Sequence, residues 1–317
     1  MRLVVRPLNV RLLALALLGA AAVSIAATGG APAGDPSFRS AGCGGPAARP
    51  GDVDLAIVSR GVRRTARVHV APAATRRAAA LVLAFHGTGG NGRFMERYSG
   101  LDAQLDRGEA IGVFPDADGS RWNVEERGGD ADDVDFARDL TAALSAHYCI
   151  DERRVYAVGV SNGGSMAALL ACRMPQLAGV AIVAGGFATL PPCRSTRPVS
   201  VLEIHGRDDP VAPYRGVPAD ARRGAVVPWL ASWIRRDRCQ RIHPRARLIA
   251  PRTIRYDWGR CRQGTAVVHI AIAGGRHQWP GATPADPGPR ATISAAAQIW
   301  SFLSRLRAPG AAGRPAP

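Results

Sequence analysis

Short apolar runs recur along the chain and predict buried β-strands. Residues 66–70 alternate apolar and polar side chains, which is typical of a half-exposed strand. Residues 81–85 are apolar throughout, as expected for a strand that is buried on both faces of a parallel sheet. Further strand-like runs lie at residues 111–114, 155–158, 180–183, 199–204 and 267–272.

Helical patterns separate or follow several of these runs. Residues 133–147 begin with acidic side chains and carry Phe136, Leu140 and Leu144 on one side. Residues 163–172 are rich in alanine, and residues 291–306 place apolar side chains at helical spacing. Because strands alternate with helices, the pattern predicts an α/β fold with a doubly wound, mostly parallel sheet in a single domain.

The composition narrows the class of protein. The chain has 317 residues and is 47% hydrophobic, which argues against a disordered or coiled-coil protein. Its net charge is +16, and each of its 41 basic residues is arginine. These arginines are spread along the chain without a recognisable nucleic-acid-binding motif, so no nucleic-acid partner is expected. The densest group, in residues 235–262, is interpreted as a solvated, irregular surface segment.

The N-terminus has the pattern of an export signal. Three arginines precede the uncharged apolar run of residues 12–27, and small residues at positions 31 and 33 match a signal-peptidase site. This run is shorter than the ~20 residues that a membrane-spanning helix needs. We therefore predict a signal peptide at residues 1–33, a secreted domain at residues 34–307 without a stable membrane span, and a disordered tail at residues 308–317.

Six cysteines follow the export signal, which is an even number in an oxidising compartment. None has the C-x-x-C spacing, and no metal-ligand pattern includes them, so three disulfides are expected instead of a metal site. About 15 pairings are formally available. Cys172–Cys193 and Cys239–Cys261 would close local loops, which leaves Cys43–Cys149. Lipidation of Cys43 stays open as an alternative, because residues 40–43 weakly resemble a lipoprotein cleavage box.

The sequence Gly159-Val160-Ser161-Asn162-Gly163 fits the pattern G-x-S-x-G. An apolar strand leads directly into this pattern, and an alanine-rich helix leaves it. A nucleophile elbow needs a serine in such a strained strand-to-helix turn, with neighbours small enough for the backbones to approach each other. The setting therefore predicts that Ser161 is a nucleophile, placed at a helix N-terminus that favours developing negative charge.

A nucleophilic serine needs an orienting acid and a base, which follow it in that order in this type of sheet. The strand at residues 199–204 leads to His205 and then to Asp208 and Asp209, and the two aspartates compete for the role of the acid. Carboxyl ends of parallel strands meet at one edge of a sheet, so either aspartate is expected near Ser161.

The base is expected to be His277. This histidine follows the strand at residues 267–272 on a Gly-rich loop, which leaves the same edge of the sheet as the serine. The other six histidines are interpreted as structural, with His86 and His205 holding loops by hydrogen bonds.

A Gly-rich turn at residues 86–90 is expected to present backbone N–H groups to the serine. We assign the oxyanion-hole donors to the amides of Thr88 and Asn162. Residues 87–92 also fit the dinucleotide-binding pattern G-x-G-x-x-G, with Asp116 at about the spacing of that fingerprint. An exported protein is not expected to use a soluble nicotinamide, and that alternative leaves the serine, aspartate and histidine unexplained. No cofactor is therefore expected.

Together these motifs resemble the secreted polyhydroxybutyrate depolymerase-like and feruloyl esterase-like α/β hydrolases. The resemblance covers roughly residues 43–306 and is densest at residues 159–164. It also includes the following matches: His86-Gly87, Asp132-Asp133-Val134, Phe136, Cys149-Ile150-Asp151, Arg154-Val155-Tyr156, Met166, His205-Gly206, Asp209-Pro210, Pro213-Tyr214, Gly274-Gly275, His277 and Trp279-Pro280-Gly281.

The resemblance implies an α/β-hydrolase fold for the domain at residues 34–307. It places the nucleophile on Ser161, the acid on Asp209 and the base on His277. Departures from the family pattern put the choice of substrate in doubt but leave the reaction type intact. Thr88 stands where many relatives carry cysteine, and larger or charged residues stand beside the triad at Arg207, Asp208 and Arg276.

The expected function is that of a secreted serine carboxylic-ester hydrolase that acts through an acyl-enzyme. Its ester substrate would be either a polyester or a hydroxycinnamoyl-polysaccharide. Neither a metal nor an organic cofactor is required for this reaction. Trp122, Tyr214 and Trp279 are candidate walls of the substrate site, although core aromatics would give the same pattern. The alternative is a non-catalytic binding protein on a hydrolase scaffold.

Overall fold

The computed structural model describes residues 36–75, 77–128, 132–216, 225–240, 243–284 and 292–309. The predicted signal peptide and residues 310–317 of the predicted tail lie outside these residues. The described part of the tail begins with Ala308, which is buried and whose amide donates a hydrogen bond to the carbonyl of Arg153.

Ten strands form one sheet in the order β1-β2-β4-β3-β5-β6-β7-β10-β9-β8. Their bounds are β1 Gly51–Ser59, β2 Val62–Val70, β3 Ala79–Phe85, β4 Ala110–Pro115, β5 Ile150–Val160, β6 Gly179–Val183, β7 Ser200–Gly206, β8 Arg245–Ala250, β9 Thr253–Trp258 and β10 Val267–Ile272. The central strands β4, β3, β5, β6, β7 and β10 pair in parallel. At the two sides of the sheet, β1, β2, β8 and β9 pair antiparallel.

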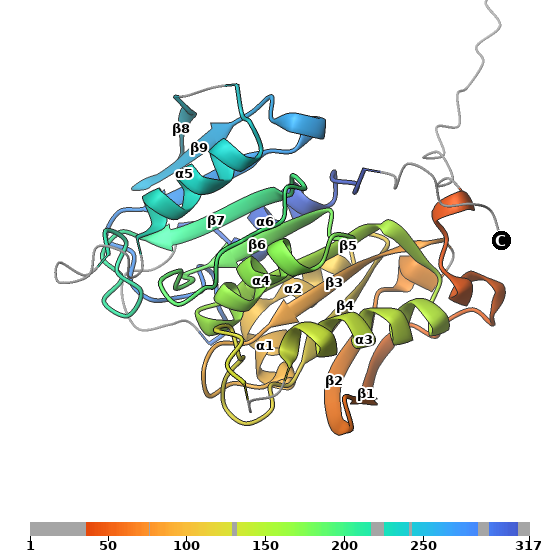
Figure 1. The fold of residues 1–317 in the computed structure, drawn as a ribbon. Coiled ribbons are helices and arrows are strands. Elements are labelled where there is room, and N and C mark those ends of the chain that lie inside the picture. Colours follow the sequence, from red (N-terminus) through yellow and green to blue (C-terminus); the bar gives the residue numbers. More distant parts are fainter. Residues whose placement is uncertain are drawn as a thin grey trace, which may run out of the picture. The chain divides into compact units, whose positions relative to one another are not determined.

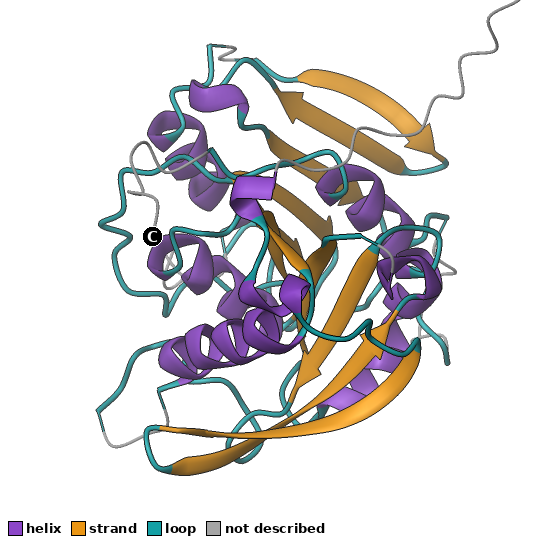
Figure 2. Cartoon of the chain, turned by 90° about the vertical axis from the view of Figure 1, so that its right-hand side faces the viewer, coloured by secondary structure: helices purple, strands orange, loops and turns teal. Residues whose placement is uncertain are grey.

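In the part of the chain that the structure describes, six α-helices cover the two faces of the sheet (Figure 1). They are α1 Gly92–Ser99, α2 Leu101–Leu105, α3 Asp133–His147, α4 Asn162–Arg173, α5 Val226–Arg236 and α6 Ala295–Leu303. Helices α3, α4 and α5 pack in one apolar cluster, and α1, α2 and α6 pack in the other. Figure 2 shows the twisted sheet between these layers. This arrangement confirms the predicted α/β-hydrolase fold.

Side chains of the central strands alternate between the two clusters. On β3, Leu81, Leu83 and Phe85 belong to one cluster, whereas Val82 and Ala84 belong to the other. Every residue of β3 is buried. A strand covered on both faces gains stability from apolar side chains at successive positions, which explains the continuous apolar runs in the sequence.

The predicted central elements are confirmed with small shifts. Each predicted strand overlaps an observed one, and α3 has the predicted bounds. The predicted helix at residues 291–306 is shorter in the structure, because the Ser294 side chain caps α6 by accepting a hydrogen bond from the amide of Ala297. The sequence did not reveal β1, β8, β9, α1, α2 or α5.

The interpretation of residues 235–262 as an irregular segment is wrong. After the end of α5, this stretch forms the antiparallel hairpin of β8 and β9, which extends the sheet beyond β10. Arginines alternate with apolar residues on the edge strand β8, whose first four residues are exposed. Arg247 on β8 forms an ion pair with Asp257 on β9, and Arg255 on β9 forms a second ion pair with the same aspartate. Charged side chains suit an edge strand because they discourage pairing with another chain.

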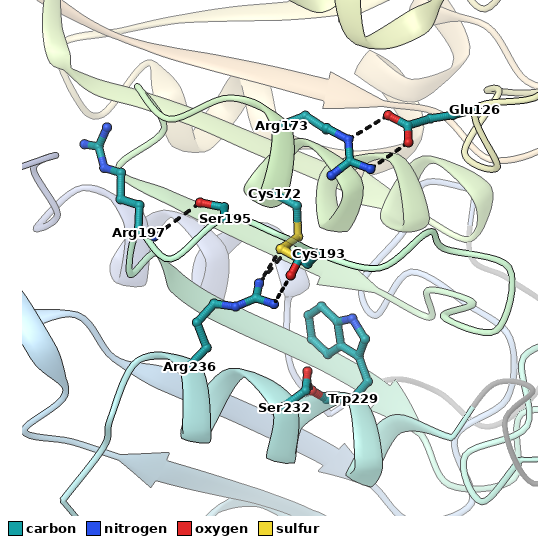
Figure 3. Close-up of a disulfide and its surroundings, with 9 residues drawn as sticks. All are labelled: Glu126, Cys172, Arg173, Cys193, Ser195, Arg197, Trp229, Ser232 and Arg236. Carbon is teal, nitrogen blue, oxygen red and sulfur yellow. Dashed lines mark hydrogen bonds and ion pairs between the residues drawn. A yellow bond between two sulfur atoms is a disulfide. The ribbon is translucent and has the colours of Figure 1, made fainter.

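Three disulfides confirm the predicted pairs Cys43–Cys149, Cys172–Cys193 and Cys239–Cys261. Figure 3 shows the second of them, which ties the end of α4 to the loop before β7. Arg236 of α5 reaches over this bond and donates a hydrogen bond to the carbonyl of Cys193 at 3.0 Å. Within the described residues, no helix is long and apolar enough to cross a bilayer.

Candidate active site

Ser161 occupies the sharp turn between β5 and α4. Its backbone has φ 55° and ψ −123°, which is a strained conformation for a residue with a side chain. Two glycines make this turn sterically feasible. A Cβ at Gly159 would lie 2.0 Å from the carbonyl oxygen of Gly163, and a Cβ at Gly163 would lie 2.2 Å from that of Phe85. The turn therefore depends on backbones packed more closely than any side chain would allow.

Loops after three different strands bring Ser161, His277 and Asp209 together. The Oγ of Ser161 lies 2.9 Å from Nε2 of His277, and Nδ1 of His277 lies 2.8 Å from Oδ2 of Asp209. The acid loop after β7 and the histidine loop after β10 are themselves joined, because the amide of Asp208 donates to the carbonyl of Gly275 at 3.0 Å. The side chains thus form one continuous hydrogen-bonded chain.

The structure distinguishes between the two competing aspartates. Asp208 is exposed, whereas the side chain of Asp209 is fully buried and contacts His277. The Oδ1 of Asp209 accepts hydrogen bonds from the amides of Val211 and Ala212, both at 2.8 Å. Burial alone would raise the pKa of Asp209, but hydrogen bonds from His205, His277 and the Ala212 amide hold it well below its usual range. Asp209 is therefore ionised and oriented.

The two residues predicted to donate to the oxyanion lie in turns that meet beside Ser161. Asn162 is the first residue of α4, so its amide belongs to the first turn, where N–H groups have no partner within the helix. Its side chain is locked by both backbone groups of Trp122: the Trp122 N–H donates at 2.7 Å and the Trp122 carbonyl accepts at 3.2 Å. Thr88 lies in the turn after β3, where a Cβ on the preceding Gly87 would lie 3.3 Å from the Cβ of Ser161.

Two of the three proposed wall residues lie in the core. Trp122 is 0% exposed and its Nε1 donates to the carbonyl of His86 at 2.9 Å, which braces the turn that carries Thr88. Trp279 is 1% exposed and its Nε1 donates to the carbonyl of Ser99 at 3.0 Å. A fully buried indole offers no surface to a substrate. Both tryptophans are therefore core residues and do not line a substrate site. Tyr214 is partly buried, with its hydroxyl 2.8 Å from Nε2 of His269.

Sequence reasoning missed Glu203 and assigned no role at the site to His205 or His269. His205 lies 3.3 Å from Oδ2 of Asp209, and Glu203 contacts both histidines. One sequence signal could have indicated these residues: Glu203 and His205 stand at alternate positions of β7, which is otherwise mostly apolar. Such positions in a buried strand need partners, and these partners became visible only when β7 and β10 were paired.

One other cluster within the described residues could in principle hold a metal ion, and it lies on β1, β2 and α1. It consists of Asp52, His69 and Glu96. The guanidinium of Arg67 already bonds Asp52 at 3.0 Å and Glu96 at 3.2 Å. The Arg67 guanidinium thus already supplies positive charge to these carboxylates, so we assign no metal ion to this cluster.

Comparisons with known proteins find esterases. No family model matches the chain. NocK of Nocardia uniformis subsp. tsuyamanensis, which is named as an esterase, is 33% identical over 253 residues, covering 72% of this chain and 74% of that protein. Feruloyl esterase B of Piromyces equi is 27% identical over 63% of this chain, and feruloyl esterase C of Emericella nidulans is 31% identical over 43% of it. These alignments cover only 40% and 51% of the two feruloyl esterases.

Solved structures with low sequence identity share the fold. An acetyl xylan esterase from Aspergillus awamori has a TM-score of 0.60 at 14% identity, covering 80% of this chain and 99% of that one. A thermostable esterase has a TM-score of 0.53 at 16% identity, covering 81% and 63%. Because the similarity to NocK extends over about three quarters of both proteins, the chain belongs with NocK to a family of esterases with the α/β-hydrolase fold and is a carboxylic-ester hydrolase.

Proposed function

We propose that the protein is an exported serine esterase whose catalytic triad is Ser161, His277 and Asp209. The observation that carries this proposal is the hydrogen-bonded chain from the Ser161 hydroxyl through His277 to Asp209, with contacts of 2.9 and 2.8 Å. His277 takes the proton of Ser161 as the serine oxygen attacks the ester carbonyl. Asp209 keeps Nδ1 of His277 protonated, so that Nε2 faces the serine as an acceptor.

The carbonyl oxygen becomes an oxyanion after this attack and needs hydrogen-bond donors. The amides of Asn162 and Thr88 supply them, and the N-terminus of α4 adds a favourable field at the same place. Each donor of this kind typically contributes ~10²–10³ in rate. The alcohol leaves with a proton from His277, and water then releases the acid from the acyl-enzyme.

The substrates proposed are esters of hydroxycinnamic acids with polysaccharides. Relatives named as feruloyl esterases support this class, although their names describe proteins that the chain covers by about half or less. Short hydroxyalkanoate polyesters are the competing substrates that the sequence resemblance raised. Comparing kcat/KM for methyl ferulate, tributyrin and hydroxybutyrate oligomers decides between them, and a preference for the oligomers would contradict the proposed class.

Secretion is proposed together with this activity. Its support is the N-terminal export pattern and the three disulfides, which form and persist in oxidising compartments. Export of the full chain by a bacterial host, with N-terminal sequencing of the product, would locate the cleavage site. Retention of residues 1–33 on the exported protein would contradict the predicted signal peptide.

Replacing Ser161 by alanine tests the central proposal. We expect the Ser161→Ala variant to lose at least about 10³-fold in kcat on a short p-nitrophenyl ester, because the acyl-enzyme cannot form. The matched control is Ser301→Ala, an exposed serine on α6. Both variants should unfold at the wild-type temperature within a few degrees. If Ser161→Ala hydrolyses the ester as fast as Ser301→Ala, the serine mechanism is wrong and the binding-protein alternative gains support.

A further inference from the structure

Behind Asp209, ionisable side chains that the mechanism above does not use are sealed inside the sheet. Glu203 and His205 lie on β7, and His269 lies opposite Glu203 on the neighbouring strand β10. The three residues are 0%, 1% and 2% exposed. Burying ionisable groups is costly unless each charge is paired and each hydrogen is shared. Their hydrogens can therefore be assigned from their partners.

The partners of His205 determine its protonation state. Its Nδ1 lies 2.7 Å from Oε1 of Glu203. Its Nε2 lies 2.8 Å from the carbonyl oxygen of Ala212 and 3.3 Å from Oδ2 of Asp209. A carbonyl and an ionised carboxylate can only accept hydrogen bonds. Both ring nitrogens of His205 must therefore carry a hydrogen, which makes this ring an imidazolium cation.

His86 provides an internal contrast, because it occupies the same His-Gly pair at the end of β3. The Nδ1 of His86 lies 2.7 Å from the carbonyl of Gly87, whereas its Nε2 accepts the amide hydrogen of Ala117 at 3.1 Å. One acceptor and one donor fit a neutral imidazole, and burial lowers the pKa of His86. The two histidines differ in charge because their neighbours differ.

Glu203 holds a second histidine with its other oxygen. Its Oε2 lies 2.6 Å from Nδ1 of His269, and Nε2 of His269 lies 2.8 Å from the hydroxyl of Tyr214. Burial alone would raise the pKa of Glu203, but His205 and His269 hold it below its ordinary value, so the carboxylate is ionised. The Nδ1 of His269 also lies 3.3 Å from the backbone carbonyl of Glu203. Glu203 thus contacts two imidazoles, and the far nitrogens of these rings contact Ala212 and Tyr214 in the loop that carries Asp209.

We propose that His205 is a permanently protonated positioning residue for Asp209, and that Glu203 is the counter-charge that keeps it protonated and fixes the acid loop. This inference rests on the proposed role of Asp209 as the orienting acid. The imidazolium shares Oδ2 of Asp209 with His277 and anchors the loop at Ala212. The carboxylate is thereby prevented from turning away from His277 between catalytic cycles.

Charge accounting explains why Glu203 is needed. Three ionisable groups face His205 directly: Glu203 on the same strand, and Asp209 and Tyr214 in the acid loop. Three more lie behind these: His269 contacts Glu203, Arg207 lies over the Tyr214 ring, and His277 contacts Asp209. Glu203 and His205 together are neutral, so the negative charge of Asp209 still acts on His277. Burial opposes the charge on His205, but Glu203 and Asp209 raise its pKa to about 10.

The protonation of His205 can be measured in the wild-type protein. In the wild-type protein labelled with ¹⁵N-histidine, we expect both ring nitrogens of His205 to be protonated at pH 8, whereas His86 shows one protonated and one unprotonated nitrogen. His205→Gln serves to assign the resonances. A neutral His205 at pH 8 would overturn the proposal whatever the activity of the enzyme.

The kinetic test replaces Glu203 by glutamine. We expect Glu203→Gln to lower kcat by on the order of tenfold or more with little change in KM, because the acid loop loses its alignment. The alkaline limb of the kcat profile should move at least one pH unit lower, since His205 then loses its proton more readily. The matched control is Glu96→Gln, a buried glutamate of α1 that pairs with Arg67 of β2 and should leave kcat and its pH profile unchanged.

The outcomes separate this inference from the proposed function. Activity that survives in Ser161→Ala removes the serine mechanism but leaves the charge of His205 as measured by NMR. If Ser161→Ala is inactive while Glu203→Gln keeps the wild-type kcat and pH profile, the triad stands and the positioning role is wrong. If Glu203→Gln does not fold, the NMR measurement on the wild-type protein decides alone.

Discussion

At the scale of single residues, the site is defined by which polar groups face each other. Asp208 and Asp209 are adjacent and chemically identical, yet only Asp209 is buried against His277 and receives two backbone N–H bonds. His86 and His205 both precede a glycine at a strand end, yet their partners imply different charges. Apart from the family match at Asp209-Pro210, local sequence does not distinguish the members of either pair, because their roles depend on neighbours that are distant along the chain.

The difference between the two aspartates predicts different kinetic effects. Asp209→Asn should lower kcat by about 10⁴-fold, because an amide no longer holds His277 in the tautomer that accepts the serine proton. Asp208→Asn should change kcat less than threefold, since its side chain is exposed. Initial rates on a p-nitrophenyl ester measure both effects. Equal losses in the two variants would mean that the acid has been assigned to the wrong residue.

Asp237 predicts a pH dependence of stability. It is fully buried after α5, and burial raises its pKa to about 7, while Arg236 and Arg262 only partly offset this. Between about pH 4 and pH 7 the folded protein holds a proton that the unfolded chain has lost. Its free energy of unfolding therefore falls as pH rises, by roughly 1.4 kcal/mol per pH unit at most, and this loss is complete above about pH 7.

Replacing Asp237 by asparagine should remove this loss. We expect Asp237→Asn to unfold at a higher temperature than the wild type at pH 8 and at a similar temperature at pH 4. The exposed Asp118→Asn variant is the control and should follow the wild type at both pH values. Calorimetric unfolding at the two pH values measures the difference. A stabilisation that is equal at pH 4 and pH 8 would rule out the ionisation of Asp237 as its cause.

At the scale of elements, the site depends on the junctions at the carboxyl ends of the strands. The strained turn at Ser161 joins β5 to α4, and this turn lies against the end of β3 without intervening side chains. The loops after β7 and β10 approach each other equally closely, because a Cβ on Gly206 would lie 2.3 Å from the carbonyl oxygen of Gly275. The elements are therefore positioned by backbone-to-backbone packing.

A methyl group at Gly163 should disturb this packing. Its Cβ would lie 2.2 and 2.4 Å from the carbonyl oxygens of Phe85 and His86, which are backbone atoms that cannot move independently. We expect Gly163→Ala to lose about 1–3 kcal/mol or more in the free energy of unfolding and most of the activity. Gly259→Ala is the control, since no atom lies within 4 Å of its added Cβ. Denaturant titrations that give both variants the same midpoint would contradict the close approach.

At the scale of the whole molecule, disulfides connect segments that the sheet alone does not join. Cys43–Cys149 links the N-terminal segment to the start of β5 over 106 residues, whereas Cys172–Cys193 spans 21 residues beside α4 (Figure 3). In the chain-entropy account, a crosslink stabilises the folded state more when it closes a longer loop in the unfolded chain.

The two disulfides should therefore differ in their effect on stability. Replacing both cysteines of Cys43–Cys149 by serine should cost about 4.7 kcal/mol, and the same change in Cys172–Cys193 should cost about 3 kcal/mol. Guanidinium unfolding of the two double variants measures the costs. A larger loss from the shorter loop would show that local packing around Arg236, which bonds Cys193, outweighs loop entropy.

Burial determines which elements can be recognised in the sequence. Strands such as β3 and β10, which are covered on both faces, show continuous apolar runs and were recognised. The edge strand β8 is largely exposed and its partner β9 is mostly half-buried, so arginines occupy positions where no core requires apolar residues, and the sequence pattern does not reveal the hairpin. Trp122 and Trp279 are candidate wall residues and candidate core residues alike in the sequence, because composition alone does not distinguish a core aromatic from a surface one.

The sequence by itself determined the alternation of strands and helices, the elbow around Ser161, and the order of serine, acid and histidine, because these features are written in local pattern and in residue order. The family resemblance places the acid on Asp209, but only the tertiary structure shows this side chain buried against His277 and brings Glu203, His205 and His269 together behind it. The physical reason is that charge state and orientation depend on which donors and acceptors meet across neighbouring strands. These contacts form only when β7 and β10 pair in a specific register.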